Sequence, residues 1–343
     1  MAGTDPADTL RRAIARHQAG ALDEAEQLYR EVLLLRPEEP DALNLLGALA
    51  LQRGDPERAI DLISRSVALR PGHAGAYANL GSALRAVGRI EDAVSQLRRA
   101  VKLDPAPAEN WDALASALEG AGDIDEAERS YTEALRRSPQ LAGAHNNLGN
   151  LMRRRGRLAE ARRHIERALA LMPGNPVVQS SLATLLLDEG RAPEAEAILR
   201  KVVAADPGTG AAHNNLGNAL LALGRPDDAA ASYAEAARLL PEAAEPESNL
   251  GAALVEAGDF QTALPRFERA LERRADYVEA LSGAVWCRQN LCRWDGLPAL
   301  AARLLEQVEH RIAEGLPPAL PPFRSLCLDT TPAQQRRIAE AHA

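Results

Sequence analysis

The sequence predicts an all-α protein in which pairs of helices stack into an elongated solenoid. A glycine recurs every 34 residues, an alanine follows each glycine five residues later, and a proline stands near the end of every repeat but the last. The glycines are Gly20, Gly54, Gly88, Gly122, Gly156, Gly190, Gly224 and Gly258, and the alanines are Ala25, Ala59, Ala93, Ala127, Ala161, Ala195, Ala229 and Ala263. The prolines are Pro37, Pro71, Pro105, Pro139, Pro173, Pro207 and Pro241. A period of this length without insertions indicates a repeat array rather than a globular core.

Within one repeat, residues 108–141, the pattern predicts two helices and the turn between them. The first helix has an apolar stripe spaced i, i+3, i+4 and i+7, formed by Trp111, Leu114, Ala115 and Leu118. Gly122 is expected to end this helix, and the Asp123 side chain to cap the next one. The second helix then turns Ala127, Tyr131 and Ala134 inward until Pro139 ends it.

Small residues in the middle of each first helix indicate that two helix backbones approach closely. That position is occupied by Gly47, Gly81, Ala115, Gly149, Ala183, Gly217 and Gly251. A large side chain at this position, or at the alanine of the second helix, would hold the backbones apart. Two second helices carry proline just after the turn glycine, at Pro56 and Pro226, which suits the first position of a helix.

Composition and charge limit the classes of function. The net charge of −8 disfavours binding to a polyanion, so we expect no nucleic-acid binding. The three cysteines, Cys287, Cys292 and Cys327, show no CxxC spacing, which favours free thiols and a cytoplasmic location. The chain has no signal segment and no apolar run long enough to span a bilayer, so no membrane insertion is expected. Arg far outnumbers Lys, which we interpret as the coding bias of a GC-rich, bacterial genome.

The pattern of Trp or Tyr, Leu, Gly or Ala, and then Leu, Gly, Ala, Tyr or Phe, Ala and Pro resembles the tetratricopeptide repeat (TPR). Residues 111–139, 77–105 and 216–241 match it closely, and Arg12 and Arg16 make the first repeat look like a solvent-facing cap. The resemblance implies a right-handed superhelical solenoid of about eight helix–turn–helix repeats, followed here by C-terminal capping helices. It also implies that first helices line a concave groove and that the array binds protein clients or extended peptides.

A column of side chains two residues before the mid-helix Gly or Ala is expected to face that groove. It reads Leu45, Asn79, Ala113, Asn147, Ser181, Asn215 and Asn249. An Asn amide offers a donor and an acceptor, so a row of them can hold a peptide backbone without reading its side chains. The candidate peptide-binding residues are Asn79, Asn147, Asn215 and Asn249, with the neighbouring Asn146, Asn150, Asn214 and Asn218. The alternative is that these amides bond across neighbouring helices.

Other polar residues are given structural interpretations. His145 and His213 stand where other repeats have Trp or Tyr, and they lie two repeats apart, so we expect packing rather than a metal site. The basic cluster of Arg153, Arg154, Arg155, Arg162 and Arg163 is interpreted as a solvated face, with contact to an acidic client as the alternative.

The repeat pattern decays after residue 270, which suggests three parts. Residues 6–277 form the TPR array, and residues 278–314 a partial ninth repeat followed by a long capping helix over 296–314. Residues 315–343 read as an extended Pro-rich connector and the start of a following domain, with Thr331 and Pro332 beginning its helix.

The order of Cys292-Arg293-Trp294-Asp295, a long amphipathic helix, Pro321 to Phe323 and a final Gln-containing helix resembles a junction in another family. It is the segment that joins the TPR arm to the catalytic region in protein O-linked N-acetylglucosaminyltransferases and SPINDLY-type relatives. That family holds protein substrates with groove asparagines and takes its sugar from a nucleotide donor. The asparagine column here is interrupted at Ala113 and Ser181, and Arg293 replaces the usual Asp.

This second resemblance implies that the chain is the substrate-recruiting arm of a parent enzyme. We expect no cofactor in this chain, because no Gly-rich phosphate loop, HExxH or CxxC is present, and only the parent would use a nucleotide sugar. The other hypothesis is a free-standing scaffold that assembles a multiprotein complex. Self-association into a homodimer is left open.

Overall fold

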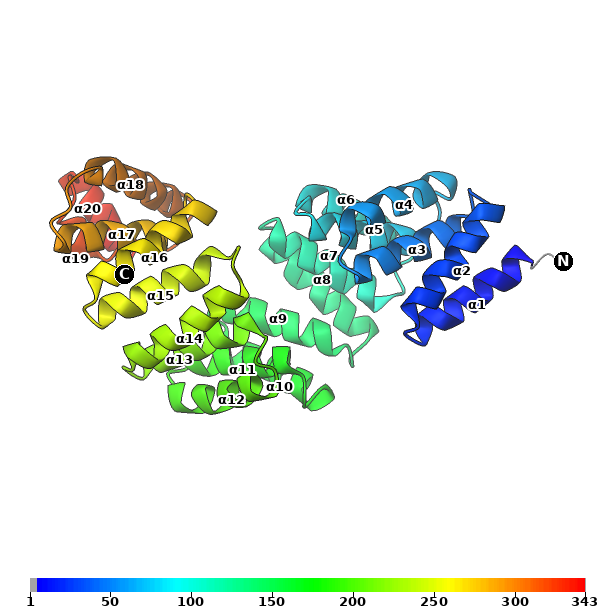
Figure 1. The fold of residues 1–343 in the computed structure, drawn as a ribbon, viewed down its shortest axis with the longest axis horizontal. Coiled ribbons are helices and arrows are strands. Elements are labelled where there is room, and N and C mark those ends of the chain that lie inside the picture. Colours follow the sequence, from blue (N-terminus) through cyan, green and yellow to red (C-terminus); the bar gives the residue numbers. More distant parts are fainter. Residues whose placement is uncertain (1–4, 343) are drawn as a thin grey trace. The chain divides into compact units, whose positions relative to one another are not determined.

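The computed structural model describes residues 5–342, with the backbone alone for residues 322 and 323. All of the regular secondary structure in that range is helical, which confirms the all-α prediction (Figure 1). No described helix combines the length and apolar character that a membrane span requires. The described chain divides after Pro173 into two compact units, and each of them is a stack of helices.

The helices of the first compact unit are α1 (Pro6–Gln18), α2 (Leu22–Leu35), α3 (Pro40–Gln52), α4 (Pro56–Leu69), α5 (Ala74–Ala86), α6 (Ile90–Leu103), α7 (Ala108–Gly120), α8 (Ile124–Arg137), α9 (Ala142–Arg154) and α10 (Leu158–Leu171). Those of the second are α11 (Pro176–Asp188), α12 (Ala192–Ala205), α13 (Gly210–Ala222), α14 (Pro226–Leu239), α15 (Ala244–Glu256), α16 (Phe260–Arg273), α17 (Val278–Asn290), α18 (Leu297–Ala313), α19 (Pro322–Ser325) and α20 (Pro332–Glu340).

The turn between the two helices of a repeat depends on a left-handed residue. All eight glycines of the repeating column have φ between 70° and 84°, a conformation that a side chain disfavours. Cys292 occupies the equivalent position in the ninth, partial repeat and has φ of 53°. The decayed pattern therefore still produces the same turn after α17. Pro56 and Pro226 begin α4 and α14, as predicted.

One predicted cap is wrong. Asp123 precedes α8, but its side chain accepts no hydrogen bond from the helix, whereas Asp55 and Asp259 each cap their helices through the carboxylate. The Asp123 carboxylate is exposed, so water solvates it and only its charge acts on the positive end of the helix. The acidic residues that follow, Asp125 and Glu126, form ion pairs with Arg155, directly after α9, and with Arg98 of α6.

Close helix approach within each repeat is confirmed by the space around the mid-helix glycines. A Cβ added at Gly217 would lie 2.5 Å from Cε1 of Tyr233, and one at Gly149 would lie 3.3 Å from the carbonyl oxygen of Ala161. Ala127 is fully buried at the same crossing in its own repeat. At the start of the first compact unit, Arg12 and Arg16 are exposed, as expected of a solvent-facing cap.

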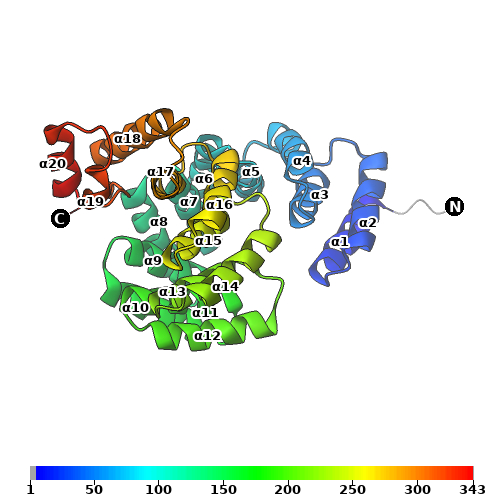
Figure 2. The same cartoon turned by 60° about the vertical axis from the view of Figure 1, so that its left-hand side comes forward.

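The residues after the eighth repeat pack back onto the ninth. Leu304 and Val308 of α18 are buried against Leu281 of α17, and Leu320 and Ile338 from the last segment join the same core. Both views place α20 beside α18 and α19 (Figure 2). The long helix and the Thr331 cap agree with the prediction, while the expected extended connector contains the short helix α19. A following domain remains a prediction.

Candidate functional site

The face formed by the first helices of successive repeats carries hydrogen-bonded amides. Asn79 Nδ2 on α5 donates to Asn44 Oδ1 on α3 at 3.0 Å, and Asn147 Nδ2 on α9 donates to Asp112 Oδ1 on α7 at 3.1 Å. In the second compact unit, Asn249 Nδ2 on α15 donates to Asn214 Oδ1 on α13 at 2.9 Å. The alternative of bonding across neighbouring helices is therefore realised at three of the predicted positions.

These bonds use only part of each amide. The Oδ1 atoms of Asn79, Asn147 and Asn249 accept no hydrogen bond from the described residues. These three oxygens are also absent from the buried side-chain atoms that lack a partner, so they are accessible to solvent. Asn215 has no side-chain partner in the described part of the chain, and it too is only half-buried. The asparagine column thus presents accessible acceptors, and at Asn215 a complete amide.

Of the other four predicted asparagines, Asn146 and Asn214 are buried, and Asn150 and Asn218 are half-buried like the column itself. Asn214 is buried, accepts from Asn249 and donates to Glu245 Oε1 at 3.0 Å. The Oδ1 atom of Asn218 accepts a hydrogen bond from the Tyr233 hydroxyl at 2.7 Å. Asn150 is half-buried and also interacts with another group. Asn146 is buried, and its Oδ1 has no partner within residues 5–342. Asn214 and Asn218 therefore take part in the packing between helices, where Asn146 is also buried.

Two acceptors of these bonds, Asn44 and Asp112, were not predicted from the sequence, whereas Asn214 was among the candidate residues. Each acceptor stands 35 residues before its donor, as Asn44, Asp112 and Asn214 show. In the preceding repeat, this position comes directly before the residue of the asparagine column. A search for polar residues one repeat plus one residue before each asparagine would have identified these acceptors from the sequence. Burial raises the pKa of Asp112, and the hydrogen bond from Asn147 opposes this rise.

The aromatic position at the start of the first helices has a common role in three repeats. Trp111 Nε1 donates to the carbonyl oxygen of Pro105 at 2.9 Å. The Nε2 atom of His145 lies 3.2 Å from the carbonyl oxygen of Pro139, and that of His213 lies 3.1 Å from the carbonyl oxygen of Pro207. The histidines therefore replace tryptophan as ring N–H donors at the repeat junction. The described residues contain no cluster of three metal-binding side chains.

Carboxylates neutralise most of the predicted basic cluster. Arg154 pairs with Glu119, Arg155 with Asp125 and Glu128, Arg162 with Glu166, and Arg163 with Glu160. These contacts favour the interpretation of a solvated, internally paired face over a site for an acidic client.

The first-helix face changes character at the ninth repeat. A hollow of about 280 Å³ extends from Asn249 on α15 to Trp286 on α17 and has Phe267 in its lining. Gly283 occupies the position of the asparagine column in α17, and a Cβ there would lie 2.2 Å from Cζ of Phe267. The glycine makes room for the ring, so an aromatic lining replaces the amide. Arg324 from the last segment lies over the Trp286 ring, with its Cζ 4.8 Å from the ring centroid.

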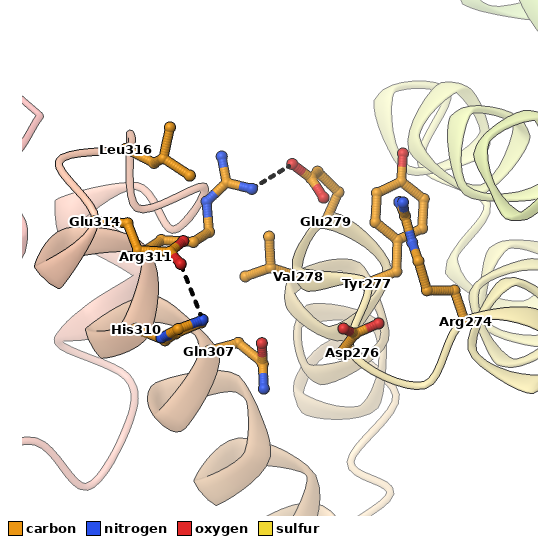
Figure 3. A pocket seen from close by; sticks show the side chains of 10 residues that line it. All are labelled: Arg274, Asp276, Tyr277, Val278, Glu279, Gln307, His310, Arg311, Glu314 and Leu316. Carbon is orange, nitrogen blue, oxygen red and sulfur yellow. Dashed lines mark ion pairs between the residues drawn. The ribbon is translucent and has the colours of Figure 1, made fainter. Parts of the chain in front are cut away.

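A second hollow of about 350 Å³ lies where the segment before α17 meets α18 (Figure 3). Arg311 pairs with Glu279 at 3.6 Å on one side, and Arg274 lies over the Tyr277 ring on the other, 3.6 Å from its centroid. These charged and aromatic groups already contact one another, so this hollow is the weaker candidate for a ligand site.

Stacked helix pairs with one amide-bearing face define a helical repeat solenoid. Sequence models of the tetratricopeptide repeat match residues 10–74 and 113–176, residues 50–118 and 153–217, and residues 208–276. The chain therefore belongs to the tetratricopeptide repeat family, whose members bind protein partners. Membership indicates a scaffold for protein–protein interaction.

Solved structures agree with this fold. The chain is similar to one in the crystal structure of the APC/C hetero-tetramer Cut9–Hcn1, with 18% identity and a TM-score of 0.64 over 78% of this chain and 52% of that one. It thus spans about half the length of that relative. A tetratricopeptide repeat protein from Parabacteroides merdae gives 17% identity and a TM-score of 0.59 over 73% of this chain and 98% of that one. A search of curated proteins found no match. The likeness of the last segment to glycosyltransferases stays a prediction.

Proposed function

We propose that the first-helix face of each compact unit binds an extended polypeptide through its backbone. The observation that carries this proposal is the asparagine column, whose oxygens remain accessible after the bonds between helices are made. The helix-to-helix bonds fix each amide in one orientation, so little side-chain entropy is lost when a peptide amide approaches. Each added hydrogen bond contributes about 0.5–1.5 kcal/mol, which gives modest affinity with little sequence preference.

Within the described residues, Gln289 gives an internal example of a side-chain amide that binds non-helical backbone, in this case as the donor. Gln289 on α17 donates from Nε2 to the backbone carbonyl oxygen of Cys327 at 2.8 Å. Cys327 lies in the turn between α19 and α20, outside any helix. A side-chain amide on a first helix therefore holds a backbone carbonyl of non-helical polypeptide in this same molecule. This supports the proposed mode of binding without identifying a client.

Asn215 offers the sharpest test, because its replacement breaks no bond within the described chain. The variants Asn215→Ala and Asn215→Asp are compared with Gln261→Ala, an exposed amide on the second helix α16. A fluorescein-labelled 20-residue Ser/Thr/Ala peptide is titrated with each protein and followed by anisotropy. Asn215→Asp removes the donor and should weaken binding about two- to tenfold, Asn215→Ala removes donor and acceptor and should weaken it at least as much, and the Gln261 variant should bind as the wild type does. Equal affinity in all four proteins refutes the groove.

We further propose that the chain is the substrate-recruiting arm of a protein O-linked glycosyltransferase, whose other part binds the nucleotide sugar. Support comes from the resemblance of residues 292–342 and from the asparagine column. The alternative is a scaffold that works alone, or as a homodimer, in a multiprotein complex. The reading frame of the gene distinguishes them: an α/β catalytic region after residue 343 supports the first, and a stop codon supports the second.

A further inference from the structure

The hollow at the ninth repeat has a chemistry that the asparagine column lacks. Its lining includes the rings of Phe267 and Trp286 and the carboxylates of Glu256 and Glu279. We infer that it is a subsite for an arginine side chain of a bound extended peptide. This inference rests on the proposed function and adds a position at which the bound peptide is selected by one of its side chains.

The aromatic surface is built to receive a flat group. Trp286 is only half-buried, and the Arg324 guanidinium already lies over its ring at 4.8 Å. Guanidinium groups stack on aromatic faces because they are planar and weakly hydrated, which favours arginine over lysine at such a surface. Because Gly283 leaves space for Phe267, this part of the lining is aromatic where the asparagine column would place an amide.

The charges around the ring complement a cation. Glu256 is exposed and has no cationic partner among the described residues, and Glu279 is held by Arg311 at the long distance of 3.6 Å. Arg324 itself forms no ion pair in the described part of the chain. The subsite therefore has negative charge that the resident arginine does not neutralise by direct contact.

The last segment forms one wall of this hollow. Ala319 and Pro321 line it together with Arg324, and Gln289 holds the carbonyl oxygen of Cys327 further along. An incoming arginine must displace Arg324 from the Trp286 ring. Removing the Arg324 side chain should therefore open the subsite to an added peptide.

The test uses the full chain and two fluorescein-labelled peptides. One has the sequence of residues 316–326, and the other is identical except for Gln at the position of Arg324. Binding is measured by anisotropy with the wild type, with Arg324→Ala, and with Arg324→Ala combined with Glu256→Gln or with Trp286→Ala. Glu256 is exposed, so its variant probes the subsite without disturbing the core.

The Arg324→Ala chain should bind the arginine peptide about three- to tenfold more tightly than the wild type does, and both double variants should lose this gain. The Gln peptide should bind weakly to all four proteins. If the two peptides bind Arg324→Ala equally, the arginine subsite is wrong although the peptide groove stands. If neither peptide nor the Ser/Thr/Ala peptide binds, both proposals fail.

Discussion

The side-chain amide of Asn249 donates a hydrogen bond of 2.9 Å to Oδ1 of Asn214, which joins the first helices of two successive repeats. Asn214 is buried and in turn donates to Glu245. Asn215, next to it in sequence, has no partner among the described residues. Two adjacent asparagines therefore differ in role, one within the packing of the solenoid and the other on its open face.

We predict that Asn249→Ala destabilises the protein by about 1–3 kcal/mol, because a buried acceptor on Asn214 loses its donor. Asn215→Ala should change stability by less than about 0.5 kcal/mol, as expected of a substitution that breaks no contact. Urea denaturation of both variants beside the wild type measures the difference. Equal midpoints for Asn249→Ala and the wild type would show that the bond contributes nothing to stability.

The mid-helix glycine of α13 gives a second prediction. Gly217→Ala should lower stability by about 1–3 kcal/mol, because the new Cβ would meet the Tyr233 ring at 2.5 Å. Gly143→Ala, in α9, is the matched control, since a Cβ there meets nothing within 4 Å. That variant should gain about 0.4–1 kcal/mol from reduced freedom of the unfolded chain. Thermal midpoints that move in the same direction would contradict the placement of Gly217.

The repeating alanine of the second helices gives a third prediction. Ala127→Leu should cost about 1–3 kcal/mol, because the residue is fully buried where α7 and α8 cross and the larger side chain must push them apart. The same change at Ala204, which is exposed on α12, should leave the midpoint nearly unchanged. Differential scanning calorimetry on the two variants compares identical chemistry at buried and exposed sites. A stable Ala127→Leu protein would refute tight packing at this crossing.

A histidine pair in the first compact unit predicts a dependence of stability on pH. The Nδ1 atoms of His145 and His164 lie 3.0 Å apart, and burial lowers the pKa of both rings below the ordinary 6.5. Repulsion by a positive charge on His145 and by nearby arginines lowers the pKa of His164 further. As pH falls below 6.5, the unfolded chain takes up protons that the folded chain does not. The pair's contribution is therefore complete above pH 6.5 and is lost as pH falls through the lowered folded-state pKa.

His164→Gln should reduce this loss, because one of the two titrating rings is removed. Thermal midpoints between pH 7.5 and 5 should fall less steeply for this variant than for the wild type. His310→Gln, at an exposed site on α18, serves as the control and should follow the wild-type profile. Parallel profiles for His164→Gln and the wild type would exclude the pair as a source of the pH dependence.

The sequence predicted the repeat architecture with little error, because its signals are local. The first helices begin at residues 6, 40, 74, 108, 142, 176, 210, 244 and 278, a spacing of 34 throughout. A glycine that must adopt positive φ and a proline that cannot continue a helix mark these boundaries wherever they occur. Asp123 shows the limit of such reasoning, because helix-start composition does not decide whether a side chain bonds the helix or remains solvated.

The candidate site was predicted in part. Composition and spacing placed the asparagines on the first helices, but only the structure paired Asn249 with Asn214 and left Asn215 without a partner. Such a pairing depends on how far each repeat is rotated against the next, a quantity that the pattern within one repeat does not contain. The aromatic lining of the hollow at the ninth repeat was missed for a related reason, since the space left by Gly283 is filled by Phe267 from another helix.

The sequence by itself thus determined the helices, their turns and the family, since the backbone preferences that set them act within a few residues. Tertiary structure alone decided which amides remain open and where Arg324 lies, because these depend on contacts between helices that are distant along the chain.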